Sequence, residues 1–439
     1  MGESMLTPGE KIKKIRKDFN IKQNEITDGK ITRNLISLVE NNKAELTDST
    51  ANIISDCINN ICKERNIDFT MTPQDLLVNN TMQADKLLDD YINTIKLNSQ
   101  NDYYDFSELI NKSEELIKKN PCLARRAELY NELGTSFLNR NDYWNAYIYF
   151  FKSYEHLNFE KERNQVLLVA IDLSFCCNNL CKFSETIQII DTVLSLDIET
   201  SDNKKYKLYF NKAIAQKNLN LYFNALDSLH EIDNNIIDDT KSFNIKTLES
   251  NCYKELQLYK EALDIQCELL HSNFSKEYTK KLIVICNIID IYKCLNNSLQ
   301  IKEYLNKAEE ILKDSSVELN TNYSHSIYYH VGIDNLYIEN NEDAINWLKK
   351  ALTEAKEKKA YKVEFDSIDN LFSIYYNKND FKTLEQLKVY LMELLTKSNK
   401  TEYHTLIYKY IHMYSMQNKK DDLDSLVSFA LNLRSSEEQ

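Results

Sequence analysis

Side chains with forked hydrogen-bonding groups are concentrated at the start of a short predicted helix over residues 32–40. Arg33 can donate two parallel hydrogen bonds to guanine, and the amide of Asn34 can pair with adenine. Because an exposed helix start can enter the major groove, we expect base contacts here and phosphate contacts from flanking residues. The expected DNA-binding residues are Gln23, Lys22, Thr32, Arg33, Asn34, Ser37 and Lys43. The alternative is that they merely form a solvated helix face.

The charge distribution separates the N-terminal region from the rest of the chain. The net charge is -13, yet residues 1–70 contain 11 basic and 11 acidic residues. The excess of acid therefore lies in residues 71–439. Residues 11–33 contain eight basic residues and only three acidic ones. A small basic surface on a large acidic protein favours local contact with phosphate and disfavours nonspecific coating of DNA.

Three short helices are predicted to position these side chains. Residues 7–10 (Thr-Pro-Gly-Glu) are typical of a capped helix start, and apolar spacing extends this helix to about Phe19. A second helix is expected over residues 23–27 and a turn over 28–30. A third helix is expected over 32–40, with Thr32 as its N-cap. Its buried side is expected to comprise Leu35, Leu38 and Val39.

Residues 11–60 resemble an XRE-type helix-turn-helix domain, the phage-repressor-like class. The matching stretches are residues 12–16, 21–26 and 33–43. Asn42 stands where this class usually has Gly, and asparagine tolerates the left-handed conformation of a helix end. Lys22 replaces the usual capping Thr, which predicts a poorly capped second helix. The resemblance implies a five-helix DNA-binding domain.

The remainder of the chain is repetitive. Residues 127–154 fit the tetratricopeptide (TPR) pattern, with Gly134 as the small residue of the first helix and Ala146 as the small residue of the second. The first-helix small residue recurs as Ser174, Ala213, Ser250 and Gly332. The second-helix position recurs at spacings of 37 to 43 residues, as Thr186, Ala225, Ala262, Ile301, Ala344 and Leu384. Such units are two-helix hairpins that bury their apolar faces on each other.

These patterns predict an all-α protein in two parts. Residues 1–66 are expected to form the helix-turn-helix domain, and residues 67–84 a linker with the start of a connecting helix. Residues 85–439 are expected to form about nine TPR-like hairpins in a right-handed superhelix with a concave inner surface. Only 5 Gly and 3 Pro in 439 residues agree with an almost entirely helical chain.

An XRE-type domain followed by degenerate repeats resembles the RRNPP family, the peptide-pheromone-responsive regulators that include the PlcR, PrgX, Rgg and NprR proteins. The resemblance implies a homodimer that binds operator DNA and a short linear signalling peptide, as in quorum sensing. The acidic balance of residues 71–439 favours a neutral or cationic peptide. Two alternatives remain open: a TPR scaffold or response-regulator inhibitor resembling Rap proteins, and a dimeric repressor that needs no ligand.

Peptide-binding residues are expected between the packing positions of the first helix in each hairpin. A side-chain amide can both donate and accept hydrogen bonds, which suits the backbone of an extended peptide. The expected residues are Asn131, Asn178, Asn211, Asn251, Tyr329 and Asp369. The alternative is that asparagine is simply abundant in this chain.

Other functions are disfavoured by the sequence. There is no HExxH, Walker A or glycine-rich dinucleotide motif, and His325 and His330 are five residues apart, off the helical ligand spacing. We therefore expect no enzyme activity, cofactor or metal. The ten cysteines make no CxxC pair, and no apolar run reaches membrane-spanning length. A cytoplasmic protein without membrane contact is expected.

Overall fold

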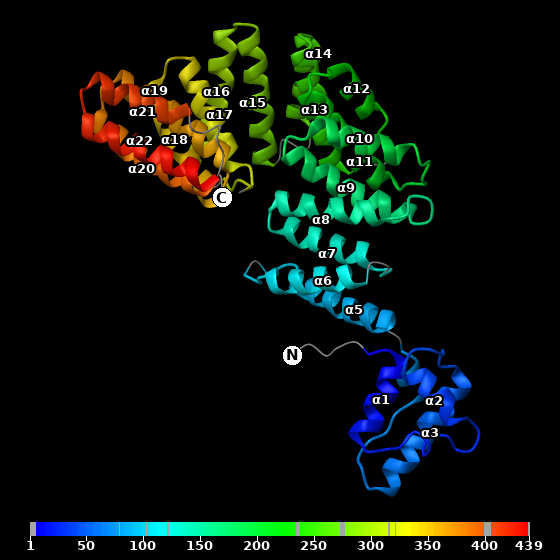
Figure 1. The fold of residues 1–439 in the computed structure, drawn as a ribbon. Helices are drawn as coiled ribbons and strands as arrows, with labels where there is room; N and C mark the ends of the chain where they lie inside the picture. Colours follow the sequence, from blue (N-terminus) through cyan, green and yellow to red (C-terminus); the bar gives the residue numbers. More distant parts are fainter. Residues whose placement is uncertain are drawn as a thin grey trace. The chain divides into compact units, whose positions relative to one another are not determined.

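The protein is all-α, as predicted. The computed structural model describes residues 6–78, 80–101, 103–120, 123–233, 238–272, 277–314, 317–320, 322–398 and 405–437. These residues contain 22 α-helices and no strand (Figure 1). None of the helices in the described ranges is long and apolar enough to cross a membrane. The chain divides into two compact units, residues 1–219 and 220–439, and each is described by itself below.

The first unit begins with a small helical head and continues as paired helices. The head contains α1 (Pro8–Asp18), α2 (Arg33–Glu40), α3 (Asp48–Glu64) and α4 (Pro73–Leu77). The helices that follow are α5 (Asn80–Asn98), α6 (Ser107–Lys119), α7 (Arg126–Asn139), α8 (Tyr143–His156), α9 (Arg163–Asn179), α10 (Phe183–Leu194) and α11 (Asp202–Asn218). Helices α7 and α8 pack together, as do α9 and α10, while α5 packs on α7 and α9 on α11.

The second unit repeats the same arrangement. Its helices are α12 (Tyr222–His230), α13 (Asp239–Glu255), α14 (Tyr259–His271), α15 (Tyr278–Cys294), α16 (Ser298–Lys313), α17 (Ser324–Tyr337), α18 (Asn341–Lys358), α19 (Tyr361–Asn377), α20 (Phe381–Ser398), α21 (Thr405–Met416) and α22 (Lys420–Glu437). The pairs α13 with α14, α15 with α16, α17 with α18, α19 with α20 and α21 with α22 are packed hairpins.

Small residues sit where hairpin helices approach most closely. A Cβ on Gly134 would lie 2.7 Å from the Phe150 ring, and one on Gly332 would lie 2.8 Å from Leu348 Cγ. The expected small positions Ser174, Ala213 and Ser250 are also fully buried. The spacing of small and large residues therefore predicted the hairpin contacts correctly.

Asparagine takes the place of glycine at many helix ends. The expected left-handed conformation at Asn42 is confirmed, with φ of 58°. The same conformation occurs at Asn20, Asn66, Asn141, Asn220, Asn296, Asn379 and Asn418. Asparagine tolerates this conformation better than other side-chain-bearing residues, so few glycines are needed.

The helix expected over residues 23–27 is a turn. Lys22 offers no side-chain acceptor to cap a helix, and its N–H instead donates to the Glu25 carboxylate at 2.5 Å. The Glu25 N–H donates to the Lys22 carbonyl at 3.0 Å, and the Thr27 hydroxyl to the Asn24 carbonyl at 2.9 Å. These local bonds close a turn, so the described part of the head contains four α-helices and not five.

Helices α1 and α2 begin where the sequence indicated, at Pro8 and Arg33. Thr7 and Glu10 form a capping box at α1, and Thr72 and Asp75 form another at α4. The core of the head is built from Ile12, Ile21, Ile26, Ile36, Val39, Ile54 and Ile58. One expectation for α2 was wrong: Leu38 is 43% exposed, and Ile36 is buried with Val39 instead. Residues 36 and 39 are three positions apart and lie on one side of the helix, whereas Leu38 lies about 160° away from Ile36.

Candidate functional site

The first turn of α2 presents polar side chains to solvent. Thr32 caps this helix, because its hydroxyl accepts a hydrogen bond from the Leu35 N–H at 3.2 Å. Arg33 and Asn34 follow directly, and Thr32, Arg33 and Asn34 are all exposed. Ser37, one turn later, is half-buried, and its carbonyl accepts from the Asn41 amide at 2.7 Å. Three of the expected base-reading side chains are therefore accessible on one helix start.

A buried ion pair fixes the position of this helix against α1. Arg16 donates from Nε and Nη2 to the Glu40 carboxylate at 2.7 and 3.1 Å, and also to the Ile21 carbonyl at 2.9 Å. Glu40 is almost fully buried. Burial acts to raise the pKa of Glu40, but hydrogen bonds from Arg16 and Gln23 outweigh it and hold the pKa below its ordinary value. Glu40 is therefore a carboxylate in the folded head.

Gln23 links this ion pair to the exposed helix start. Its amide nitrogen donates to Glu40 Oε2 at 2.8 Å, and its amide oxygen accepts from Arg33 Nε at 3.4 Å. Gln23 is half-buried, so one end of its amide is fixed by Glu40 while the other faces Arg33. Sequence reasoning assigned Gln23 to phosphate contact and missed the roles of Arg16 and Glu40. No local pattern marks a pair 24 residues apart as a buried contact.

The surface around α2 carries several lysines that form no ion pair within the described part of the chain. Two of its acidic residues are already paired, Glu25 with Arg65 at 2.6 Å and Asp28 with Lys30 at 2.7 Å. Lys14, Lys17, Lys22 and Lys43 are exposed and make no ion pair with any described residue. Such lysines suit contact with phosphate, which needs charge and little geometric precision.

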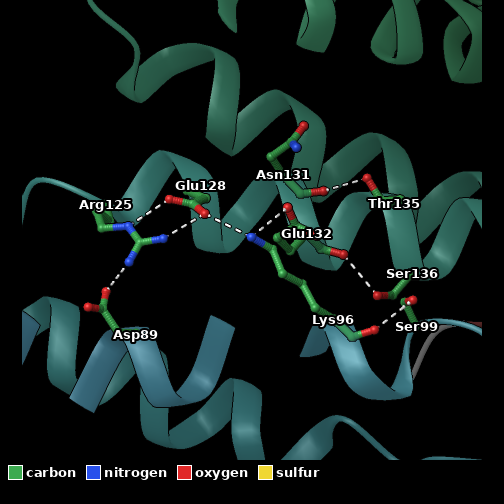
Figure 2. A network of polar contacts seen from close by, with 9 residues as sticks. All are labelled: Asp89, Lys96, Ser99, Arg125, Glu128, Asn131, Glu132, Thr135 and Ser136. Atoms are coloured by element: carbon green, nitrogen blue, oxygen red, sulfur yellow. Dashed lines mark hydrogen bonds and ion pairs between the residues drawn. The ribbon is translucent and has the colours of Figure 1, made fainter. Parts of the chain in front are cut away.

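A second group of charged residues joins α5 to α7. Arg125, just before α7, contacts Asp89 of α5 and also donates to both oxygens of Glu128 at 2.7 Å. Lys96 of α5 reaches Glu128 at 3.0 Å and Glu132 at 3.5 Å. Figure 2 shows this network, with the amide of Asn131 directed away from it. The charged side chains between α5 and α7 therefore form ion pairs with one another.

Asn131 lines a cavity whose wall also includes Glu128 of this network. The cavity measures about 230 Å³ and lies between α7, α8 and α9. Its walls are Ala127, Glu128, Asn131, Ser153, Leu157, Gln165, Leu168 and Val169. Of the expected peptide-binding residues, Asn131 is the one that lines this cavity.

Asn178 and Asn211 join neighbouring helices of the first unit. The Asn211 amide nitrogen is buried and donates to Ser174 Oγ at 3.0 Å and to the Ile171 carbonyl at 3.3 Å. Asn178 donates to the Asn211 carbonyl at 2.9 Å. These bonds tie α9 to α11, so both amide nitrogens are used inside the protein.

The expected residues of the second unit lie on three helices. Asn251 is half-buried on α13. Tyr329 of α17 is hydrogen-bonded to Asn370, and burial together with the nearby charge of Asp366 raises the pKa of Tyr329 to about 12. Asp369 of α19 forms an ion pair with Lys409 of α21 at 2.5 Å. Within the described residues, no group of three or more His, Cys, Asp or Glu could hold a metal ion.

Comparison with known proteins finds similarity at the level of solved structures. No protein-family model matches the chain, and no curated protein sequence matches it. The apo form of RapI is 12% identical, with 89% of this chain and 99% of RapI covered at a TM-score of 0.48. The apo form of the quorum sensor NprR from B. thuringiensis is 16% identical, with 80% and 99% covered at 0.43. PlcR from Bacillus thuringiensis, in complex with the peptide PapR7 and DNA, is 13% identical, with 81% and 97% covered at 0.25. At these identities the likeness concerns the fold alone.

Proposed function

We propose that this chain is a sequence-specific DNA-binding transcriptional regulator whose repeat region binds a short signalling peptide. The observation that carries the proposal is the start of α2. There, Thr32, Arg33 and Asn34 are exposed together on a helix held by the buried Arg16–Glu40 pair. A rigid helix with accessible forked donors at its N-terminal turn is suited to reading base edges.

The electrostatics of the head support contact with a duplex. Three acidic groups, Glu25, Asp28 and Glu40, are paired with Arg65, Lys30 and Arg16, while the exposed lysines keep their charge available. Phosphate contacts by Lys22 and Lys43 would set the register of the head, and Arg33 and Asn34 would read sequence. One head of this size makes few contacts, so we propose that two heads of a homodimer bind one operator.

The peptide part of the proposal is supported by the cavity beside α7. Asn131 supplies an amide that makes no side-chain hydrogen bond with the described residues, so it is available to a peptide backbone. Residues 71–439 are acidic, which favours a neutral or cationic peptide. Binding of the peptide would change how the two heads are held on DNA, since ligand and DNA would then share one conformational equilibrium.

The experiment is selection of operator DNA from a random duplex library by the full chain, followed by titration of variants. Arg33→Ala should lower affinity for the selected sequence by about 1 to 3 kcal/mol and relax preference at one base pair. Arg163→Ala removes another exposed arginine, at the start of α9, and should leave affinity unchanged. Failure to enrich any sequence, or equal effects of the two variants, would contradict DNA reading by α2. A chain that binds peptide but no DNA would favour the interaction-scaffold alternative.

A further inference from the structure

The cavity beside Asn131 occupies a place where two neighbouring helices fail to pack. In the first unit α5 packs on α7, and α9 packs on α11. Helices α7 and α9, both fully described, make little direct contact with each other. The cavity of about 230 Å³ lies between them, and its wall also includes Ser153 of α8 and Leu157, which directly follows α8. The space between α7 and α9 is therefore not filled by side chains of these two helices.

The walls of the cavity combine aliphatic surface with few available polar groups. Leu157, Leu168 and Val169 supply apolar surface, and Leu168 is 48% exposed, so a ligand can reach the cavity from solvent. The Ser153 hydroxyl is already used, because it donates to the Ala127 carbonyl at 2.8 Å. The side-chain amides of Asn131 and Gln165 make no hydrogen bond with the described residues.

The one charged group in the wall is neutralised. Glu128 accepts hydrogen bonds from Arg125 at 2.7 Å and Lys96 at 3.0 Å, as Figure 2 shows. The hydrogen bond from Arg125 is the main reason that the pKa of Glu128 is held below its ordinary value. A charged ligand group would therefore find no free partner in the wall and would lose its hydration on entry.

The volume sets the size of the ligand group. An apolar protein cavity of about 150 Å³ accepts benzene, which has six carbon atoms. By proportion, the cavity here holds roughly nine non-hydrogen atoms. That is about the size of one leucine or isoleucine residue with its peptide groups, and it is small for an indole ring with its backbone.

We propose that this cavity is a specificity pocket for one neutral aliphatic residue of leucine size in the bound peptide. The side chain would enter between Leu157, Leu168 and Val169, while the amides of Asn131 and Gln165 bond the adjoining peptide groups. The inference rests on the peptide binding proposed above and adds the chemical class of residue that this position selects.

The experiment uses the full chain with ¹³C-labelled leucine and valine methyl groups and the probe N-acetyl-leucine N-methylamide. This probe presents one aliphatic side chain between two peptide groups. Saturable shifts are expected for the methyls of Leu157, Leu168 and Val169, and the aspartate analogue should give none. Leu168→Trp fills the mouth of the cavity and should weaken binding at least tenfold. Leu299→Trp, at a 74% exposed position of α16, is the matched control and should bind as the parent chain does.

Three outcomes would overturn the pocket: no saturable shift, equal shifts with the aspartate analogue, or unchanged binding by Leu168→Trp. The test involves no DNA, so it fails separately from the regulatory function. If the chain binds the leucine probe but never DNA, the pocket is supported and the proposed regulatory function is contradicted. If a peptide changes the DNA affinity of the chain but the leucine probe causes no shifts, the regulatory function is supported and the pocket is contradicted.

Discussion

Replacing Glu40 with glutamine tests whether the buried ion pair holds α2 in place. Glutamine preserves the shape of the side chain but removes its charge. Its amide group would also turn an N–H donor toward Arg16 or Gln23, where the carboxylate accepts three hydrogen bonds. Arg16 would keep its bond to the Ile21 carbonyl but lose its charged partner.

The magnitude follows from the burial of the pair. Removing one partner of a buried ion pair costs about 3 to 5 kcal/mol. The Arg16 side chain is 17% exposed and keeps one backbone acceptor, so we expect the lower end, about 3 kcal/mol, for Glu40→Gln. Replacing both residues with methionine removes both charges at once and should cost far less than the single change, because such pairs are often neutral against apolar replacements.

The pair also predicts a dependence on pH. The pKa of Glu40 in the folded head lies below the ordinary glutamate value of 4.5. The stability that it supplies is therefore fully present above that ordinary value, and it is lost as the pH falls through the lower folded value. The difference in stability between the parent chain and Glu40→Gln should shrink over this acidic range.

The assay is hydrogen exchange of the α1 and α2 amides in the full chain, because global unfolding of so long a chain does not report on the head alone. Glu40→Gln should reduce the opening free energy of α1 and α2 and leave that of α17 and α18 unchanged. A loss below 1 kcal/mol, or a double variant as unstable as the single one, would refute the reasoning. So would a difference that stays constant down to acidic pH.

Three further predictions follow from other parts of the chain. Gly134→Ala should destabilise the chain by about 1 to 2 kcal/mol in urea unfolding, because crowding against Phe150 exceeds the gain in helix propensity; a stabilised variant would contradict this packing. Residues 1–78 alone should bind the selected DNA more weakly and with a smaller salt dependence than the full chain, whereas equal affinity would count against binding by two heads. A peptide that changes DNA affinity should have its own affinity changed by DNA by the same factor, and identical peptide isotherms with and without operator would show that the two sites are independent.

The sequence predicted the parts of this fold that depend on spacing along one helix pair. A small residue faces a large one in several hairpins, as Gly134 faces Phe150 and Gly332 faces Leu348, whereas Ile289 and Phe372 depart from the pattern. Capping residues such as Thr7 and Thr32 act within three residues of themselves, so their effect is also visible locally. These signals involve residues close together in the sequence, so they can be recognised without knowledge of the rest of the structure.

Contacts between distant segments could not be predicted in the same way. The turn at residues 23–26 fails to become a helix because Lys22 leaves its start uncapped and Glu25 bonds back to it. Gln23 is then free to reach Glu40, 17 residues later. A polar residue near the start of the DNA-reading helix is thus part of the support for that helix, which its residue type alone did not indicate.

The asparagines of the repeats show how the place of a residue on its helix decides what its side chain contacts. Successive residues of a helix are about 100° apart, so a residue's direction follows from its offset to the small residue that faces the hairpin partner. Asn211 lies two positions before Ala213, about 160° from the partner helix, and it bonds to α9. Asn131 lies three positions before Gly134, about 60° from that direction, and it lines the cavity. Tyr329 and Asp369 share the offset of Asn131, three positions before Gly332 and Phe372, yet Tyr329 bonds to Asn370 of α19 and Asp369 pairs with Lys409 of α21. The same offset thus directs each side chain toward the first helix of the next hairpin, and of these three residues Asn131 is the one that meets a cavity there in place of a polar partner among the described residues.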